Sequence, residues 1–581
     1  MNRKQWVATV VTIAMAMVLG MGTAEAIDQT WNGSPDMNWL EPDLTSWSGA
    51  TYQNGDNVTF TAAGAGTVNL QAGTVSPANI TINATANYIF TNGTVSAGGT
   101  LTKDASANNS GYTTRFLTSL SAGTVDCKYD NLSLTTLSDS ADPIQLSGGT
   151  FMLDSAATAD IVLNQRPLVL NASTVNLYDN NDGQGVFFNG PVQMNGTGNM
   201  TINMYEGERP SYAGTYAGAS RIAGNIGDRS GGVTTVASYN DGYWELTGNN
   251  TYSGQTYFNS TGGITFRGRA AFPANTTIRG TSQGDATWCK FLMDDAGTIN
   301  LGNEVDISSL GNESAAFGVY VGSDSGTESG KTIVMGKIDF NNGANSRSCL
   351  TLYSAGANGY RVQVGDVDLD VNRATSQIMG QQGFRGNTAP MTIAGTVKQV
   401  NGNSGNTTAN ELYLGGTMDA ATNIVSGLIT DPDDYPTNVL AQPLKVTINC
   451  SDTYSGTQDS TWAFENTNTY SGGTTINRGT LHANGEHALG SGTVTVSSAS
   501  AMLVINANNA TDIAATLNLP GTSATNLFMI ADYCAVAVLT IGGTPQPTGV
   551  YKASENAWLG GSGSLYVGVE TPEVGAVLSI R

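Results

Sequence analysis

Short segments of three to five residues that are typical of strands, bounded by glycine or asparagine, recur along this sequence. Between residues 468 and 505, alternating apolar and polar residues predict strands at 474–477, 479–481, 493–496 and 502–505. One coil of such strands buries too little apolar surface to form a core alone. The first and third of these strands start about 20 residues apart, which is a repeat-architecture period. The pattern therefore predicts stacked coils that share one interior.

The triplet Gly-Thr-apolar recurs widely along the sequence. Glycine permits the tight turn, and the following residues enter a strand. Glycine accounts for 72 residues and charged residues for 12% of the chain, whereas globular domains average about 25% charged residues. The abundance of Val, Ile, Thr and Tyr argues for strands rather than disorder. The triplet begins at residues 66, 73, 93, 99, 123, 149, 297, 395, 416, 479 and 492.

We therefore expect an all-β fold, specifically a parallel β-helix (β-solenoid) with capping segments at both ends. An array of β-sandwiches is the competing fold, but it predicts longer strands and clear linkers. The best candidate for a break is "DPDDYPTNVLAQP", whose prolines and acidic residues interrupt strands. The expected organisation is a signal peptide (1–26), an N-terminal cap and first coils (27–115), a main β-helix (116–430), a break or loop (431–443), repeat-bearing coils (444–520), a C-terminal cap (521–570) and a tail (571–581).

The N-terminus has the layout of a secretory signal peptide. Arg3 and Lys4 precede the apolar stretch "WVATVVTIAMAMVLG", and the small-x-small site "AEA" ends at Ala26. The apolar segment is short for a membrane anchor, so we expect cleavage after Ala26. After that cleavage we expect no membrane-spanning segment, and we predict that the protein is secreted or held at the cell surface.

Charge and cysteine content restrict the partners and cofactors. The net charge of −22 argues against nucleic acid as a partner. The partners we expect are polysaccharide, extracellular matrix or another cell surface. The cysteines form no CxxC pair, which disfavours a zinc cluster, and we interpret them as small buried residues. They are Cys127, Cys289, Cys349, Cys450 and Cys534.

Two segments carry a likeness to a known repeat. "LTGNNTYSGQT" (246–256) and "NTYSGGTTINRGTL" (468–481), the latter followed by "ALGSGTVTV" (488–496), resemble the autotransporter-associated β-strand repeat, also called the passenger-associated transport repeat. The first copy departs from the repeat after Thr256. Residues 30–60 and 544–567 resemble the opening and closing segments of large secreted bacterial proteins with such repeats. The resemblance implies a right-handed parallel β-helix that is secreted or displayed by a bacterium, often with an adhesive or structural role.

Aromatic residues after the signal peptide form the first candidate site. Trp31, Trp39 and Trp47 are eight residues apart, and Tyr52 follows. Their rings could stack on the apolar faces of sugars. An open solenoid end, however, must cover its core and its edge strands. We favour a structural cap.

Histidines and arginines form weaker candidates. His482, His487 and Glu486 suggest a metal site, but we place them in a glycine-rich turn without the helical spacing of zinc hydrolases. Arg267 and Arg269 are predicted to share one strand face opposite Phe266, where with Arg279 they could grip an anionic sugar or serve a lyase. We prefer the interpretation that these arginines lie on an outward strand face and that Phe266 is buried. The same functional interpretation, with the same preference for a plain outward face over it, applies to Arg209, Arg221 and Arg229.

Acidic side chains could hold calcium or hydrolyse a glycoside, but neither acidic segment has EF-hand spacing. Turn chemistry explains Asn, Asp and Gly in these segments. We therefore assign no catalytic residue, no cofactor and no metal ligand. The acidic candidates are Asp179, Asp182, Asp431, Asp433 and Asp434.

The favoured function is a non-catalytic structural or adhesive surface protein. The alternatives are a polysaccharide lyase or glycoside hydrolase, or an extracellular carbohydrate-binding protein, because solenoids host all of these. An enzyme predicts a groove with converging carboxylates, basic groups and aromatic rings. A structural protein predicts outward ladders of Asn, Thr and Ser.

Overall fold

The computed structural model describes part of the chain, which divides into two compact units, Met1–Asn195 and Gly196–Arg581. The signal-peptide prediction falls almost wholly outside the described part. The described residues are 26–33, 36–40, 42, 46–48, 50–105, 111–181, 183–206, 219–239, 243–259, 262–281, 284–307, 315–342, 348–354, 359–371, 381–386, 389–401, 410–416, 421–433, 435, 442–449 and 459–571.

The first unit contains a parallel ladder with one strand from each coil. Val58, Ile80, Leu101 and Val125 are paired in sequence along this ladder and are all buried. The intervening residues face outward, so Thr59, Thr81 and Thr102 form a threonine ladder. In order, the strands are β2 (Trp47–Ser48), β1 (Asp28–Trp31), β3 (Asn57–Thr61), β6 (Asn79–Asn83), β8 (Leu101–Lys103), β10 (Val125–Cys127), β12 (Ile144–Leu146), β15 (Leu168–Leu170) and β18 (Val192–Met194).

A second parallel ladder closes another side of this unit. Its interior row includes Phe90 and Phe116, whose rings stack with centroids 4.4 Å apart. The 3-10 turn η1 (Ala62–Gly64) precedes its first strand. Its strands are β4 (Gly66–Asn69), β7 (Tyr88–Ser96), β9 (Thr113–Ser121), β11 (Asn131–Leu134), β13 (Thr150–Leu153) and β16 (Thr174–Asp179), with β5 (Thr74–Val75) also on β7; β14 (Ile161–Leu163) pairs with β17 (Val186–Phe188) on a third side.

The second unit repeats this plan with three ladders. One contains β19 (Met200–Glu206), β21 (Thr234–Tyr239), β23 (Thr256–Asn259), β25 (Ile278–Thr281), β28 (Val305–Ile307), β31 (Ile338–Asn342), β34 (Val367–Val371) and β37 (Val397–Asn401). Another contains β20 (Ser220–Ile222), β22 (Tyr243–Leu246), β24 (Gly263–Arg267), β26 (Gly284–Leu292), β29 (Ala315–Gly322), β32 (Ser348–Ser354), β35 (Gln381–Gly386), β38 (Asn410–Gly416), β40 (Leu444–Ile448), β42 (Thr474–Ile476), β44 (Val494–Val496), β46 (Thr516–Leu519), β49 (Val538–Ile541) and β50 (Thr544–Pro545).

The third ladder of the second unit begins with very short strands and continues to the C-terminal coils. It contains β27 (Ile299–Asn300), β30 (Thr332–Val334), β33 (Arg361–Val364), β36 (Met391–Ile393), β39 (Thr422–Val425), β41 (Thr461–Phe464), β43 (Gly479–Ala483), β45 (Ala501–Ile505), β47 (Leu527–Met529) and β52 (Leu559–Gly561). A small sheet of β48 (Tyr533–Val536), β53 (Ser564–Val567) and β51 (Gly549–Lys552) completes the unit.

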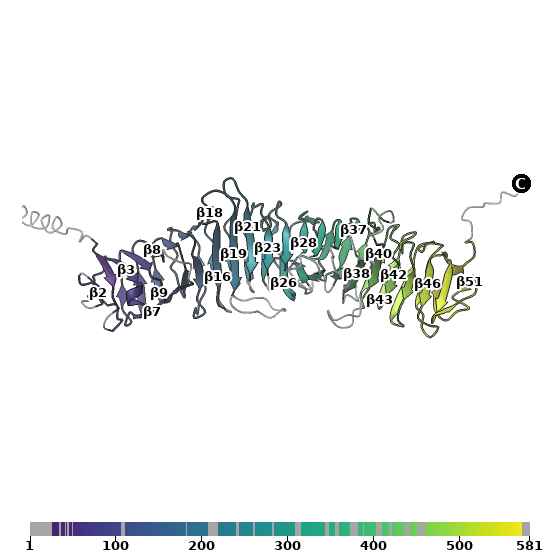
Figure 1. Cartoon of the computed structure of the whole chain (residues 1–581), viewed down its shortest axis with the longest axis horizontal. Helices are drawn as coiled ribbons and strands as arrows, with labels where there is room; N and C mark the ends of the chain where they lie inside the picture. The colour runs from purple at the N-terminus through teal and green to yellow at the C-terminus, as the bar shows by residue number, and fades with distance from the viewer. Residues whose placement is uncertain are drawn as a thin grey trace, which may run out of the picture. The chain divides into compact units, whose positions relative to one another are not determined.

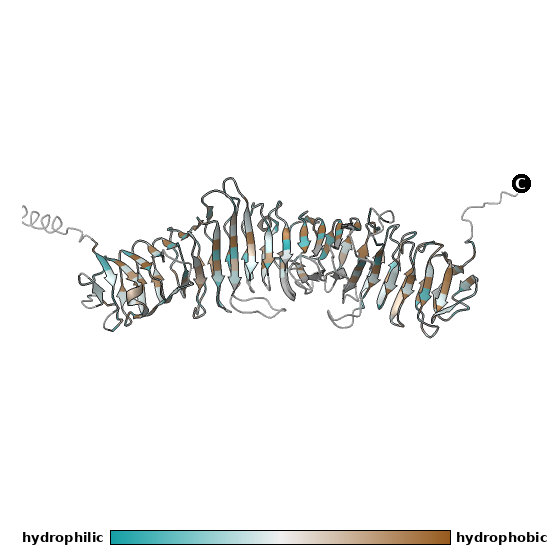
Figure 2. Ribbon diagram, in the orientation of Figure 1, coloured by the Kyte–Doolittle hydropathy of each residue, from teal (hydrophilic) through white to brown (hydrophobic). Residues whose placement is uncertain are grey.

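The pairing confirms the predicted parallel β-helix and rejects the β-sandwich array. Strand β42 pairs in parallel with β44, and β43 pairs in parallel with β45, as the repeat spacing predicts. Hydrogen bonds between neighbouring coils join residues 20 to 24 positions apart in this region. Successive strands of each unit lie side by side in Figure 1, and apolar and polar residues alternate along them in Figure 2. The finer domain limits predicted above stay predictions.

Antiparallel pairing occurs near the outermost coils of the described chain. Strand β1 pairs antiparallel with β2 at the N-terminal side, and β49 with β50 and β51 with β53 at the C-terminal side. A chain that folds back on its last strand covers an edge that would otherwise pair with another molecule. These pairs are the arrangement expected of end caps.

Both described copies of the repeat motif build the same buried corner. In the second copy, Asn468 Oδ1 accepts a hydrogen bond from Ile429 N (2.8 Å), and its Nδ2 donates to Ala488 O (2.7 Å). In the first copy, Asn250 makes the matching bonds to Ile226 N (2.8 Å) and Ala271 O (2.7 Å). Each asparagine therefore connects the preceding coil to the following one.

The other motif residues complete this corner in a matching way. Tyr470 OH lies 2.5 Å from Thr474 Oγ1, and Tyr252 OH lies 2.9 Å from Thr256 Oγ1. The motif glycines pack against backbone, because a Cβ on Gly472 would lie 2.5 Å from Leu444 O. The motif is thus a buried polar joint between coils. The sequence contains the tetrapeptide "TYSG", which both copies share, once more at 453–456, and that segment lies outside the described residues.

Candidate functional site

Three tyrosines line up on the outer face of the β19–β21–β23 ladder in the second unit. Tyr205 and Tyr239 are register partners, and their rings stack with centroids 5.3 Å apart. Tyr257, on the next strand, lies 5.9 Å from Tyr239 by ring centroid. The three rings are half-buried, whereas the alternate residues of their strands, such as Val236 and Phe258, are fully buried. They therefore present ring surface to the outside, one ring per coil.

Charged side chains continue this row along the same ladder. Tyr257 pairs with Arg279, and Arg279 pairs with Asp306. Asp306 then pairs with Asp339, and further partners extend the row through Asp368 to Lys398. We call the whole set the outer row: Tyr205, Tyr239, Tyr257, Arg279, Asp306, Asp339, Asp368 and Lys398.

The charged side chains of the outer row form ion pairs. Arg279 Nε lies 3.5 Å from Asp306 Oδ2, and Lys398 Nζ lies 2.8 Å from Asp433 Oδ2. Lys337 bridges two coils through Asp339 (3.4 Å) and Asp368 (2.5 Å). The hydrogen bond to Asp368 raises the pKa of Lys337, which therefore stays charged. Three aspartates therefore stand in register between two basic side chains, and Lys337 offsets part of their negative charge.

The tyrosine end of the row is less polar. Burial, followed by the neighbouring Tyr257 and Tyr205, raises the pKa of Tyr239. The phenol therefore stays neutral at physiological pH and retains its hydroxyl hydrogen. A stacked aromatic surface beside an arginine suits a ligand with apolar faces and hydroxyl edges, because the rings contribute contact area and the hydroxyls contribute hydrogen bonds.

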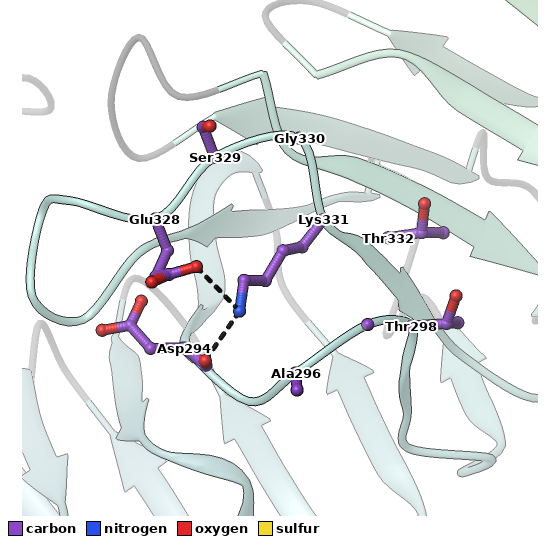
Figure 3. Close-up of a pocket in the computed structure, with 9 residues that line it drawn as sticks. Asp294, Ala296, Thr298, Glu328, Ser329, Gly330, Lys331 and Thr332 are labelled. Atoms are coloured by element: carbon purple, nitrogen blue, oxygen red, sulfur yellow. Dashed lines mark hydrogen bonds and ion pairs between the residues drawn. The ribbon is translucent and has the colours of Figure 1, made fainter.

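A polar pocket of about 570 Å³ lies elsewhere in the second unit, between two loops. Figure 3 shows Lys331 reaching across it to both walls. Its Nζ donates to Asp294 O (2.7 Å) and Asp295 O (2.6 Å) and lies 3.1 Å from Glu328 Oε2. The amine thus joins the loops and is already occupied. The lining residues are Asp294, Ala296, Gly297, Thr298, Glu328, Ser329, Gly330, Lys331 and Thr332.

The carboxylate of Asp294 is also occupied by this loop junction. It accepts hydrogen bonds from Ser323 Oγ (2.6 Å) and Ser325 N (2.6 Å). Burial opposes ionisation, but these hydrogen bonds outweigh it and lower the pKa of Asp294 to about 2. Burial, together with the Asp294 charge, raises the pKa of Tyr360 to about 12. A carboxylate with so low a pKa is a poor general base at neutral pH, so the pocket is better suited to structure than to proton transfer.

The predicted aromatic cluster lies inside the first unit. Trp31, Trp39 and Tyr52 are 0% exposed and Trp47 is 5% exposed. Trp39 packs edge-on to Phe60 at 5.3 Å, and Trp31 Nε1 donates to Gly64 O (3.0 Å). Buried rings have no face free for a sugar, so the structural interpretation is the one that fits.

The expectation that Arg267 and Arg269 share a strand face is wrong. Strand β24 ends at Arg267, Gly268 adopts φ +79°, and Arg269 starts the 3-10 turn η2 (Arg269–Ala271). The glycine turns the chain, and the alternation of a strand no longer applies. Phe266 is buried, as predicted.

The arginines serve different contacts. Arg267 joins Glu245 Oε1 and Asp324 Oδ1, both at 2.7 Å. Arg269 Nη1 donates to Phe272 O (2.7 Å). Arg221 lies in β20, and Arg229 is buried. Arg209 lies outside the described residues.

The histidine site also needs a correction. His482 lies in strand β43, not in the predicted turn, and its Nδ1 is 3.1 Å from Asn506 Nδ2. Burial lowers its pKa. His487 does lie in the turn, with φ +54°, and its Nε2 is 4.0 Å from Glu486 Oε1. His482 therefore lies in strand β43 and His487 in the turn after it, so the two histidines belong to different elements.

The acidic candidates act as local hydrogen-bond acceptors or ion pairs. Asp179 is buried at the end of β16 and accepts from Asn181 N (3.2 Å). Asp431 Oδ1 accepts from Leu444 N (2.7 Å), and its Oδ2 accepts from Ser471 Oγ (2.6 Å). Asp433 pairs with Lys398. Asp182 and Asp434 lie outside the described residues.

The cysteines that are described are buried, as predicted: Cys127, Cys289 and Cys534. Cys450 and the side chain of Cys349 lie outside the described part. Among the described residues, no three His, Cys, Asp or Glu side chains gather closely enough to hold a metal ion. The helices searched in that same part include none with the length and apolarity to cross a bilayer.

Sequence analysis missed the outer row. Its members are spaced irregularly, since Tyr205 and Tyr239 are 34 residues apart in the chain while Tyr239 and Tyr257 are only 18 apart. Loops of different length separate the coils, so no fixed period connects them. An alignment of the predicted strands by their expected buried residues is the signal that would place these side chains at one shared outward position.

Comparison with known proteins gives limited similarity. A segment of 46 residues, 8% of this chain, is 50% identical to "Adhesin BmaC autotransporter" of Brucella suis biovar 1 (strain 1330) and covers 1% of that protein. No family model matches the chain. No solved structure matches it either.

Proposed function

We propose that this protein is a secreted or cell-surface β-helical protein with a structural and adhesive role. The single observation that carries the proposal is the outer row, in which each coil adds a polar or aromatic side chain to one continuous outward line. Such a line offers many weak contacts in series, and linked contacts bind more strongly than separate ones. The similarity of a short segment to an autotransporter adhesin supports the same role and the same location outside the cell.

Side-chain ladders on other faces support the structural part of the proposal. Asn57 Nδ2 donates to Asp28 Oδ1 (3.0 Å), and Asn79 Nδ2 donates to Asn57 Oδ1 (2.9 Å). Asn195 and Asn171 make the same kind of bond at 3.1 Å. These bonds join neighbouring coils of the first unit along its surface, which suits a β-helix with a structural role.

Binding of polysaccharide without turnover is the second candidate. The stack of Tyr205 on Tyr239, with Arg279 near by along the row, favours it. Sugars present apolar faces to aromatic rings and hydroxyl groups to charged side chains. The ligand would lie along the row, across the strands.

The test is retention of the purified mature protein on immobilised polysaccharides and on bacterial and host cell surfaces. We expect Tyr239→Ala combined with Tyr257→Ala to weaken retention at least tenfold. The matched control is Tyr129→Ala, which removes an exposed tyrosine of the first unit, outside the row. Equal retention by both variants would contradict a role for the row.

Incubation of the purified mature protein with the same polysaccharides tests catalysis. Release of reducing ends or unsaturated sugars that is lost in Arg267→Ala would favour the enzyme alternative instead. Retention of one polysaccharide without any release would favour the binding protein over a purely structural protein.

A further inference from the structure

A lysine and an aspartate meet inside the first unit, where the remaining positions of the row are apolar. Lys103 occupies an inward position of β8, paired with Ile82 on one side and Cys127 on the other. Asp130 lies in the turn after β10 and has φ +57°. Both side chains are 0% exposed, and Lys103 Nζ lies 3.7 Å from Asp130 Oδ2. The amine and the carboxyl group are therefore held close together in a solvent-inaccessible site.

The hydrogen bonding of this pair is unusually poor. Neither carboxyl oxygen of Asp130 has a hydrogen-bond partner, although both are fully buried. Lys103 Nζ makes a long hydrogen bond of 3.4 Å to Ala84 O. A buried ion pair is favourable only when further hydrogen bonds satisfy the remaining polar atoms. This site lacks them at the carboxyl group, so a charged pair is poorly supported there.

Transfer of one proton from Lys103 Nζ to the carboxylate in the course of a reaction between the two groups would remove both buried charges. Burial lowers the pKa of Lys103, although the charge of Asp130 opposes that effect. A neutral amine is a nucleophile, and the group within its reach is the carboxyl group whose Oδ2 lies 3.7 Å away. Fixing two reacting groups at contact distance replaces an encounter in solution and lowers the barrier strongly.

We propose that Lys103 and Asp130 become joined by an intramolecular amide bond. Lys103 Nζ attacks Asp130 Cγ, a C–N bond forms and the C–OH bond breaks. The hydroxyl leaves with one proton from the amine as water, so no oxidant or other reactant is needed. The product is uncharged, which removes the buried ion pair, and the dry interior protects it from hydrolysis.

The bond would connect β8 of one coil to the turn that follows β10 in the next coil. Like a disulfide, it would close a loop and restrict the unfolded chain, which stabilises the folded state. It would do so within the first unit, between two coils whose strands β8 and β10 are paired directly. This inference is independent of the outer row and of any ligand.

The test is mass spectrometry of the purified, folded mature protein under denaturing conditions. We expect a mass one water lower than the sequence requires. Trypsin cuts after Arg115 and Lys128, which lie between the two residues, and the peptides that contain Lys103 and Asp130 should still travel as one branched species. Fragmentation of that species should locate the link at those two side chains.

Two variants serve as controls. Lys103→Arg keeps the positive charge but should restore the full mass and separate the peptides, and this reading holds even if the variant is less stable. Lys128→Arg alters a partly exposed lysine that lies 3.4 Å from Asp104, and it should keep the link. A wild-type protein of full mass, with separate peptides, would overturn the proposal and leave the pair as an ion pair.

Discussion

Tyrosine has opposite environments at two places in the second unit. At the repeat corners, Tyr252 and Tyr470 are 0% exposed, and each hydroxyl is bonded to the threonine four residues later. In the outer row, Tyr239 and Tyr257 are half-buried and contact rings of neighbouring coils. The corner uses tyrosine to fill and satisfy an interior, whereas the row uses it to present a surface. Changes at the corner should therefore affect stability, and changes in the row should affect binding.

The largest effect is expected from Asn468→Ala. The substitution leaves Ile429 N and Ala488 O buried without their partner. We expect a loss of about 2–6 kcal/mol, since each of the two unsatisfied buried groups costs about 1–3 kcal/mol. Urea unfolding followed by circular dichroism measures it. The exposed Asn466→Ala in the same segment is the control, with a change within about 0.5 kcal/mol.

The next effect concerns the close approach of two backbones at the same corner. In Gly472→Ala, the new Cβ would lie 2.5 Å from Leu444 O, so the backbone must shift. We expect a loss of about 1–3 kcal/mol in the same unfolding experiment. Gly521→Ala adds the same methyl group where nothing lies within 4 Å. A similar loss in both variants would show that packing at the corner is not the cause.

Removal of a buried hydroxyl should have a moderate effect. Tyr470→Phe takes away the bond to Thr474 Oγ1 and should cost about 1 kcal/mol. Tyr252→Phe should cost a similar amount, because its corner is built in a matching way. A double-mutant cycle of Tyr470→Phe with Thr474→Val isolates the pair. A coupling energy near zero would contradict the hydrogen bond.

Tyr239→Ala should disturb stability less than Asn468→Ala, because its side chain is only half-buried. Each of its two cross-strand ring contacts is worth about 0.2–1 kcal/mol. The expected midpoint of urea unfolding is close to that of the wild type. A loss as large as that of Asn468→Ala would break the distinction between corner and row.

The smallest effect is expected at Asp294, whose charge is screened by solvent. Its pKa of about 2 lies below the usual value of about 3.9 for an unfolded aspartate. The carboxylate therefore contributes stability above about pH 4, and this contribution is lost as the pH falls toward 2. Melting temperatures at pH 5 and pH 2.5 should differ less in Asp294→Asn than in the wild type. An equal difference would contradict the assigned hydrogen bonds.

Local patterns predicted the elements well where strands are regular. The strands around residues 474–505 and their parallel partners follow from alternation and spacing. The same reasoning failed at Arg269, because Gly268 takes a conformation that ends the alternation. It also placed His482 in a turn, although β43 extends past Leu481. Single-residue departures from a strand are decided by backbone conformation, which residue types indicate only weakly.

Residue order alone established an all-β solenoid, because short alternating segments with glycine turns have few other ways to bury apolar surface. Which side chains meet across coils was settled only by folding. Register between coils depends on loop lengths, and these vary along the chain. Tyr205 and Tyr239 stack, and Lys103 faces Asp130, because separate coils bring distant positions to one place. The contacts that carry both proposals therefore follow from the pairing of strands and from no local pattern.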